Sequence, residues 1–118
     1  MPTLIRRKHV KIPKRVKTSH KGDSGYVLCV GGSKEYTGAV ALAGLAALRS
    51  GCDSVRIAEP EKVAWAINAY SPDLVTMKLK ASHFNSSHFK IVKKQMQKFD
   101  VLLIGNGIGL KNETKQFC

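Results

Sequence analysis

Residues 26–58 read YVLCVGGSKEYTGAVALAGLAALRSGCDSVRIA, and this stretch decides the fold. It opens with a continuous apolar run, 26–30, which is typical of a strand buried on both faces of a parallel sheet. The Ala- and Leu-rich segment 38–50 is apolar almost all round, which predicts a buried helix that ends at Gly51. A second strand is expected over 54–58. This strand–helix–strand order favours an α/β fold with a mainly parallel sheet.

The same alternation continues toward the carboxyl end of the chain. We expect a helix from Pro60 to about Ala69, a short strand or irregular segment over 74–79, an amphipathic helix over 86–99 and a buried strand over 101–104. Ligands of parallel sheets bind beyond the carboxyl ends of the strands. Glycine turns follow two of the predicted strands, at 31–33 and 105–109, so a candidate site is expected where these turns meet.

The positive charge is concentrated at the amino end. The chain has 118 residues, with 20 Lys and Arg against 8 Asp and Glu. Residues 1–21 hold eight of these bases and no acid, so they are interpreted as a basic leader. The predicted α/β domain of 22–118 therefore keeps a net charge of only +4. A basic block of this kind is typical of a solvated or phosphate-seeking arm.

Composition argues against several classes of protein. No apolar run approaches the roughly 20 residues of a membrane helix, so no membrane partner is expected. The cysteines, Cys29, Cys52 and Cys118, are too far apart for a disulfide framework or a zinc site. His83 and His88 have no partners at ligand spacing, so no metal site is predicted. A reducing, cytoplasmic location is expected.

Three segments are candidates for binding. Gly38 and Ala39 follow the first glycine turn, and their small side chains leave space beside a ligand at a helix start. Gly105 and Gly107 lie in the turn GNGIG, which lacks the dinucleotide-fingerprint spacing but can form a backbone nest. For both turns, the pattern leaves a ligand site and a purely structural turn equally open. The segment 19–25, SHKGDSG, favours a polar turn.

Taken together, the order and spacing of these segments are far more specific. SHKGDSG, then residues 26–64, then AYSPDL (69–74) and DVLLIGNGIG (100–109) resemble the ADP-dependent NAD(P)H-hydrate dehydratase family. That family forms the carboxyl-terminal domain of the bifunctional nicotinamide nucleotide repair proteins and belongs to the ribokinase-like superfamily. The resemblance runs from about Pro13 to Thr114. It implies a partial ribokinase-like three-layer sandwich that lacks the carboxyl-terminal half of the family domain.

The resemblance also implies an activity. Such enzymes are carbon–oxygen lyases that repair NADHX and NADPHX, the hydrated forms of NADH and NADPH. A phosphoryl group passes from ADP, or from ATP in some relatives, to the hydroxyl of the hydrate. Phosphate then leaves, the ring double bond is restored, and AMP is the other product of the ADP reaction. Mg²⁺ is the implied metal cofactor, and a homo-oligomer, commonly a tetramer, is the implied assembly.

Site residues can be carried over where this sequence matches the family motifs. Ala39 and Gly107 match positions that contact the hydrate, and Gly38 and Gly105 shape these contacts. The leading motif is matched by His20, Lys21, Gly22 and Asp23, which are expected to have a supporting role at the rim of the same site. Asn106 stands where the family has proline, and this loss of a fixed φ makes the loop less rigid.

Two features of the family are missing from this sequence. They are the later histidine-containing substrate loop and the Gly-Asp motif that supplies the catalytic Asp, so no catalytic residue is predicted. We expect a truncated chain that is inactive alone and is either oligomeric or completed by a second chain. Two alternatives stay open: a basic nucleic-acid-binding α/β module, without sequence-specific recognition, and a fragment of another ribokinase-like small-molecule kinase.

Overall fold

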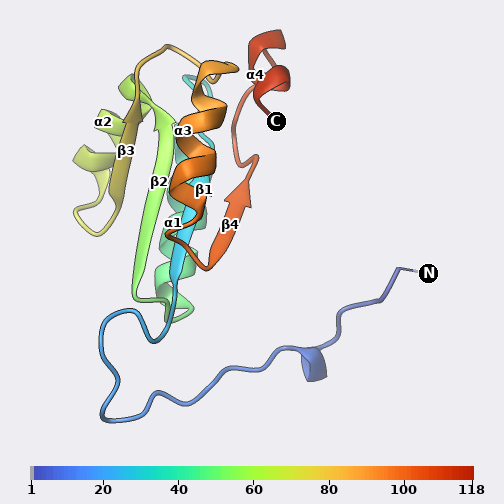
Figure 1. Ribbon diagram of the computed structural model, residues 1–118, viewed down its shortest axis with the longest axis vertical. Helices are drawn as coiled ribbons and strands as arrows, with labels where there is room; N and C mark the ends of the chain where they lie inside the picture. Colours follow the sequence, from blue (N-terminus) through green and yellow to red (C-terminus); the bar gives the residue numbers. More distant parts are fainter. Residues whose placement is uncertain (1) are drawn as a thin grey trace.

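The computed structural model describes residues 2–118 as a four-stranded parallel sheet with helices on both faces (Figure 1). The strands are β1 (Tyr26–Val30), β2 (Ser54–Pro60), β3 (Val75–Leu79) and β4 (Val101–Ile104), in the order β3-β2-β1-β4. The helices are α1 (Thr37–Arg49), α2 (Glu61–Tyr70), α3 (Ser87–Met96) and α4 (Asn112–Phe117), with a short 3-10 turn at Arg7–His9. The predicted α/β fold class is confirmed.

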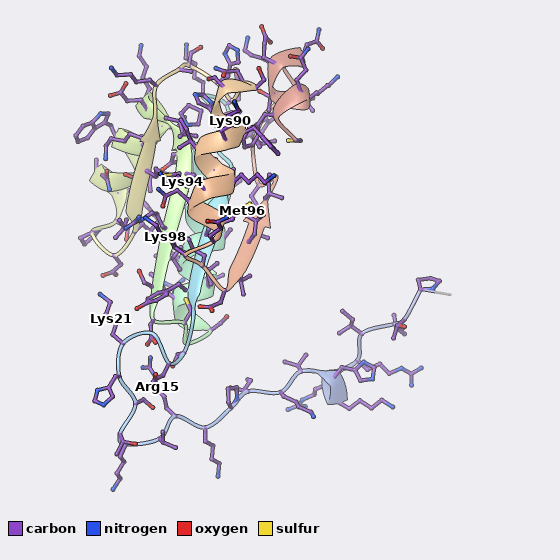
Figure 2. All side chains as sticks on the ribbon, in the orientation of Figure 1. Arg15, Lys21, Lys90, Lys94, Met96 and Lys98 are labelled. Atoms are coloured by element: carbon purple, nitrogen blue, oxygen red, sulfur yellow. The ribbon has the colours of Figure 1, made fainter. Side chains whose placement is uncertain are left out.

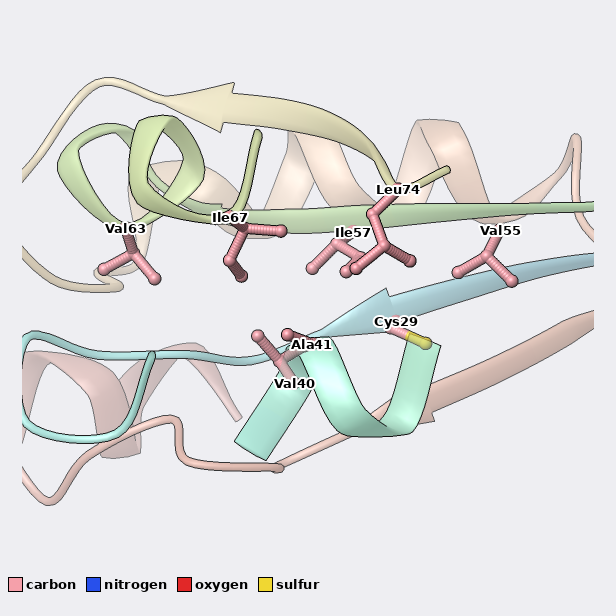
Figure 3. Packing of buried hydrophobic residues seen from close by; sticks show 8 residues of the cluster. All are labelled: Cys29, Val40, Ala41, Val55, Ile57, Val63, Ile67 and Leu74. Atoms are coloured by element: carbon pink, nitrogen blue, oxygen red, sulfur yellow. The ribbon is translucent and has the colours of Figure 1, made fainter. Parts of the chain in front are cut away.

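The two faces of the sheet have separate apolar cores. On one face, side chains of α1 and α2, such as Val40 and Ile67, pack against Ile57 of β2 (Figure 3). On the other face, Val92 of α3 and Phe117 of α4 belong to the second cluster. Because successive strand residues point to opposite faces, a strand covered on both sides must be apolar throughout. This requirement explains why β1 could be recognised from its composition alone.

The strand order places a topological switch point between β1 and β4. From β1 the chain turns to α1 on one face of the sheet, whereas from β4 it turns to α4 on the other. The register pairs Val30 with both Ala58 and Ile104, so the carboxyl ends of β2, β1 and β4 meet at one edge. Crevices that hold ligands form at such switch points, because the two connections diverge.

Two expectations about burial are wrong. The strand β4 is at the edge of the sheet, and its four side chains, Val101 to Ile104, are all exposed. The helix α1 buries only Val40, Ala41 and Gly44, and Leu42 is 66% exposed. The apolar composition of β4 and α1 predicted that both would be buried on several sides. Within residues 2–118, each of them packs against the rest of the domain on one side only.

The leader is tied to the domain by one acidic side chain. Asp53 accepts hydrogen bonds from the amides of Gly22 and Ser24, both at 2.8 Å, and forms an ion pair with Arg15. These contacts place the segment that precedes β1 against the start of β2. Upstream of Arg15 the chain runs outward from the domain (Figure 1).

Candidate functional site

The glycine turns after β1 and β4 interlock through their backbones. The amide of Gly32 donates to the carbonyl of Asn106 at 2.8 Å, and the amide of Gly105 donates to the carbonyl of Val30 at 3.0 Å. A Cβ atom on Gly31 would lie 2.3 Å from the carbonyl oxygen of Asn106. Only glycine permits this approach, so the first turn is glycine-rich because a second backbone lies against it.

The second turn also lies directly on the beginning of α1. A Cβ atom on Gly107 would be 2.6 Å from the carbonyl oxygen of Tyr36 and 3.0 Å from the Cβ of Ala39. Gly107 has a φ of +63°, a backbone conformation that residues other than glycine rarely adopt. The structure therefore brings together Ala39 and Gly107, the two residues that the family resemblance assigns to hydrate contact.

A cleft of about 540 Å³ opens beside this junction, at the carboxyl edge of the sheet. Three connections form its walls: those after β1, after β3 and after β4. This carboxyl-edge cleft is lined by Ser33, Lys34, Glu35, Tyr36, Ser82, His83, Ile108, Gly109, Leu110, Lys111 and Thr114. Its volume lies in the range of small-molecule sites.

The other two predicted contact positions lie beside open space. A Cβ atom on Gly38 or on Gly105 would meet nothing within 4 Å. Gly38 borders a second, smaller groove of about 330 Å³ between α1 and α2, where Tyr70 forms part of the wall. These two glycines are thus not required by packing within residues 2–118, in contrast to Gly31 and Gly107.

His83 is a cleft residue that the sequence pattern did not identify. The hydroxyl of Ser82 lies 2.9 Å from its Nδ1, and Glu113 Oε2 lies 3.8 Å from its Nε2. The ring is therefore held between a hydroxyl and a carboxylate, beside Lys111. His83 has no partner at metal-ligand spacing in the sequence, but it lies in the connection after β3, and such connections border the carboxyl edge of a parallel sheet.

The leading motif lies at the opposite edge of the sheet. The amide of His20 donates to Asp23 Oδ2 at 2.8 Å, within the motif itself, and the amide of Gly22 donates to Asp53 Oδ2. All of these residues precede β1, whose five residues span about 16 Å. The structure does not bring His20, Lys21, Gly22 and Asp23 to the carboxyl-edge cleft, so their expected place at its rim is not found in this chain.

Glu59 is a second residue that the sequence did not single out. It lies near the end of β2, is fully buried, and neither carboxyl oxygen has a hydrogen-bond partner within residues 2–118. A Cβ on Gly32 would be 3.3 Å from Glu59 Oε2, which places the carboxyl beneath the first glycine turn. Desolvation raises the pKa of Glu59 to about 8, and the nearby Lys78 offsets part of that rise.

A magnesium site needs several oxygen ligands close together. Across residues 2–118, no three His, Cys, Asp or Glu side chains gather in a way that could hold a metal ion. The carboxyl-edge cleft has Glu35 in its wall and Glu113 beyond His83, which is too few oxygen ligands in one place for a hard divalent cation. The Mg²⁺ that the resemblance implies is therefore not assigned to residues of this chain.

None of the helices within residues 2–118 combines the length and the apolar character needed to cross a bilayer.

Comparison with known proteins gives a consistent picture. The sequence profile of the NAD(P)H-hydrate dehydratase family matches residues 27–118. A bifunctional NAD(P)H-hydrate repair enzyme of Methanothermobacter thermautotrophicus is 40% identical over 105 residues, which are 89% of this chain and 20% of that protein. An ATP-dependent (S)-NAD(P)H-hydrate dehydratase of Entamoeba histolytica is 38% identical, over 83% of this chain and 32% of its own length.

Solved structures agree with the sequence relatives. A ribokinase-like superfamily protein of Enterococcus faecalis superposes with a TM-score of 0.73 at 25% identity, over 89% of this chain and 34% of its own. An ADP/ATP-dependent NAD(P)H-hydrate dehydratase of Bacillus subtilis, co-crystallised with ATP and Mg²⁺, gives a TM-score of 0.67 at 26% identity, over 93% and 38%. This chain spans about a fifth of the length of the first-named relative and little more than a third of these structures. By sequence and by fold, the chain belongs to the NAD(P)H-hydrate dehydratase family.

Proposed function

We propose that this chain binds the hydrated nicotinamide cofactors NADHX and NADPHX, as the amino-terminal part of a dehydratase domain that repairs them. One observation carries the proposal: Gly107 lies directly on Tyr36 and Ala39, so both predicted hydrate-contact residues belong to one junction at the switch point. The matched family consists of dehydratases, which argues against a fragment of another ribokinase-like small-molecule kinase.

The parts of the site have different roles in this proposal. Ala39 and Gly107 pack tightly on each other beside the carboxyl-edge cleft, whereas Gly38 and Gly105 have open space beside them, to which we assign the bulky ring of the ligand. Lys34 and Lys111 line the carboxyl-edge cleft and supply positive charge to the phosphates of a dinucleotide. His83, held by Ser82, offers a ring nitrogen for hydrogen bonding in the same cleft.

A role for ADP or ATP is proposed only because the chain belongs to the dehydratase family. When bound in a dehydratase, ADP or ATP supplies the phosphoryl group that turns the hydroxyl of the hydrate into a leaving group. No residue of this chain is assigned to that transfer. The contribution proposed for residues 22–118 is to hold and orient the hydrated cofactor.

Gly38 provides the sharpest test, because filling its space should leave the fold intact. The Gly38→Leu variant adds bulk where nothing lies within 4 Å. A matched control is Ala46→Leu, which adds a similar side chain at an exposed position further along the same helix. Thermal unfolding of each protein is followed with NADHX, NADPH, and ADP with Mg²⁺.

A ligand that binds only the folded state raises its stability, by about 2.7 kcal/mol at one hundred times its Kd. We expect NADHX to raise the Tm of the parent chain and of Ala46→Leu, and to have a much smaller effect on Gly38→Leu. If NADHX leaves the parent Tm unchanged at millimolar concentration, the binding proposal fails. If it stabilises Gly38→Leu as much as the parent chain, the placement of the ligand beside Gly38 is wrong.

A further inference from the structure

The domain contains a second concentration of positive charge, separate from the leader. Residues 74–99 include six basic residues and no Asp or Glu: Lys78, Lys80, Lys90, Lys93, Lys94 and Lys98. The flanking residues 22–73 carry six acids against four bases, and residues 100–118 carry two of each. The net charge of +4 on 22–118 is thus confined to one segment, whose main element is α3.

The lysines of α3 and its following turn are arranged in a row on the solvent side. Lys90, Lys94 and Lys98 recur at four-residue steps, so they lie on one side of the helix. All three are exposed, whereas Val92 and His88 are buried on the opposite side against the sheet. Figure 2 shows the three side chains one after another along α3.

Nothing within the described chain neutralises this row. The two ion pairs among residues 2–118 are Arg15–Asp53 and His83–Glu113, and neither includes a lysine of α3. Lys93 lies over the ring of Phe89, at 5.8 Å from its centroid, which turns it away from the row. Like charges four residues apart destabilise a helix, so the pairs Lys90–Lys94 and Lys94–Lys98 are unfavourable unless an anion lies beside them.

We propose that Lys90, Lys94 and Lys98 form a binding surface for the phosphate backbone of nucleic acids, without sequence recognition. The row extends over about 12 Å along α3 and its following turn, since each residue of a helix rises 1.5 Å. A duplex presents one negative charge per about 1.7 Å of its axis, so a straight row of ammonium groups matches a linear polyanion. This surface is independent of the hydrated-cofactor site, which lies at the carboxyl edge.

A membrane surface fits these residues less well. Helices that lie in a bilayer interface bury their apolar stripe among the lipid chains. In α3 the centre of that stripe, at Val92, is already packed in the core with Phe84 and Leu28. Phe89 and Ile91 remain about half exposed on α3, but the three lysines of the row offer charge rather than apolar area, which favours phosphates in solution over lipid.

The test measures binding of a fluorescein-labelled random-sequence DNA duplex by anisotropy, between about 50 and 200 mM NaCl. The variant Lys90→Gln/Lys94→Gln/Lys98→Gln removes the row with a residue of similar helix propensity. The control Arg49→Gln/Lys62→Gln/Lys115→Gln removes the same number of charges from exposed positions outside α3. A third variant, with Arg at the three row positions, keeps the charge. Circular dichroism verifies that each variant is folded.

We expect the row variant to lose at least tenfold in affinity at the lowest salt, and its slope of log K against log salt to become shallower by about 2 to 3. The control should change both quantities much less, and the Arg variant should bind like the parent chain. Equal losses in the row variant and the control would overturn the proposal, because net charge alone would then explain binding. Vesicles containing phosphatidylserine are tested in parallel, and row-dependent binding to vesicles without binding to DNA would also overturn it.

Discussion

At the scale of the residue, Glu59 has the most unusual environment in the domain. A buried carboxyl without hydrogen bonds disfavours its ionised form, because the charge has lost its water and gained no donor. Burial raises the pKa of Glu59 to about 8 from 4.5, against the opposing effect of Lys78. The lysine does not compensate fully, because its ammonium donates to Asn68 at 2.8 Å and to Thr76 at 3.0 Å.

This pKa gives a testable dependence of stability on pH. Between about pH 4.5 and 8 the unfolded chain has released the Glu59 proton while the folded chain retains it, so stability falls as pH rises through this window and levels off above it. The Glu59→Gln variant lacks this contribution. We expect it to be more stable than the parent chain at pH 9, by a few kcal/mol at most, with little difference near pH 4. Urea unfolding at several pH values measures this. Equal stability of the two proteins at pH 9 would show that Glu59 is solvated or paired.

Two glycines of the site region differ in what packing requires of them. In Gly31→Ala, the new methyl group would lie 2.3 Å from the carbonyl of Asn106, which forces β1 and β4 apart. We expect a loss of about 3 kcal/mol or more in the free energy of unfolding. In Gly38→Ala the methyl group meets nothing, and the change should stabilise α1 by up to about 1 kcal/mol. Denaturant unfolding of both variants checks the opposite signs, and a neutral Gly31→Ala would contradict the observed contact.

The structure brings together the two glycine turns that the sequence placed at one edge of the sheet, while the binding roles of their residues stay predictions. The junction of Ala39 with Gly107 was expected, because both follow strands whose carboxyl ends share an edge. The sequence could not indicate the cleft position of His83 or the burial of Glu59. The position of His83 and the burial of Glu59 depend on how segments far apart in the sequence pack together. A local sequence pattern does not contain this information.

At the scale of the element, the strand that begins the fold depends on a turn held by Asp53. This carboxylate accepts the amides of Ser24 and Gly22 and pairs with Arg15. The hydrogen bond from the Ser24 amide, together with the Gly22 amide and the Arg15 guanidinium, holds the pKa of Asp53 below its usual value. The leading motif thus has a visible structural role at the amino edge of the sheet.

The Asp53→Asn variant tests this role. A group with a lowered pKa contributes stability above its ordinary pKa of 3.8, and that contribution is lost as pH falls through its folded value. We expect the variant to have a lower Tm than the parent chain at pH 7, and a difference that shrinks as the pH falls below 3.8. Thermal scans across pH measure this, and a difference that persists unchanged in acid would exclude the charge as the cause.

The order of elements followed from the sequence, but their exposure did not. Apolar runs and helical spacing predicted β1, β2, β4, α1, α2 and α3 to within a few residues, and left 74–79, which forms β3, open as a strand or an irregular segment. Pro60, expected in the first turn of a helix, instead ends β2 and precedes α2. The apolar composition of 101–104 predicts a buried strand, but β4 is exposed. Burial depends on the order of strands in the sheet, and β4 lies at the edge of the sheet.

At the scale of the whole molecule, apolar surface gathers on one side of the domain. A groove of about 990 Å³ runs between the leader, α1 and β4, with Ala43, Ala47 and Leu103 among its lining residues. The outer edge of β4 adds unpaired backbone groups to this surface, and such edges pair readily with other chains. The two related structures are longer, since the chain covers 34% and 38% of their lengths.

The proposed cofactor site and the proposed lysine row lie on different parts of this molecule. The carboxyl-edge cleft is bordered by the connections after β1, β3 and β4, whereas the row follows the solvent side of α3. Changes that abolish one function should therefore leave the other intact. The two proposals can be tested on the same protein with separate variants.

The most direct test of the central claim is an NMR titration of the folded chain with authentic NADHX, followed at the backbone amides. We expect the resonances of Tyr36, Ala39 and Gly107 to shift together and to saturate at one ligand concentration. The amides of Gly22 and Asp23, at the opposite edge of the sheet, should not move and serve as the internal reference. Shifts confined to the amino edge, or no shifts at saturating NADHX, would contradict the claim that the two glycine turns form one site for the hydrated cofactor.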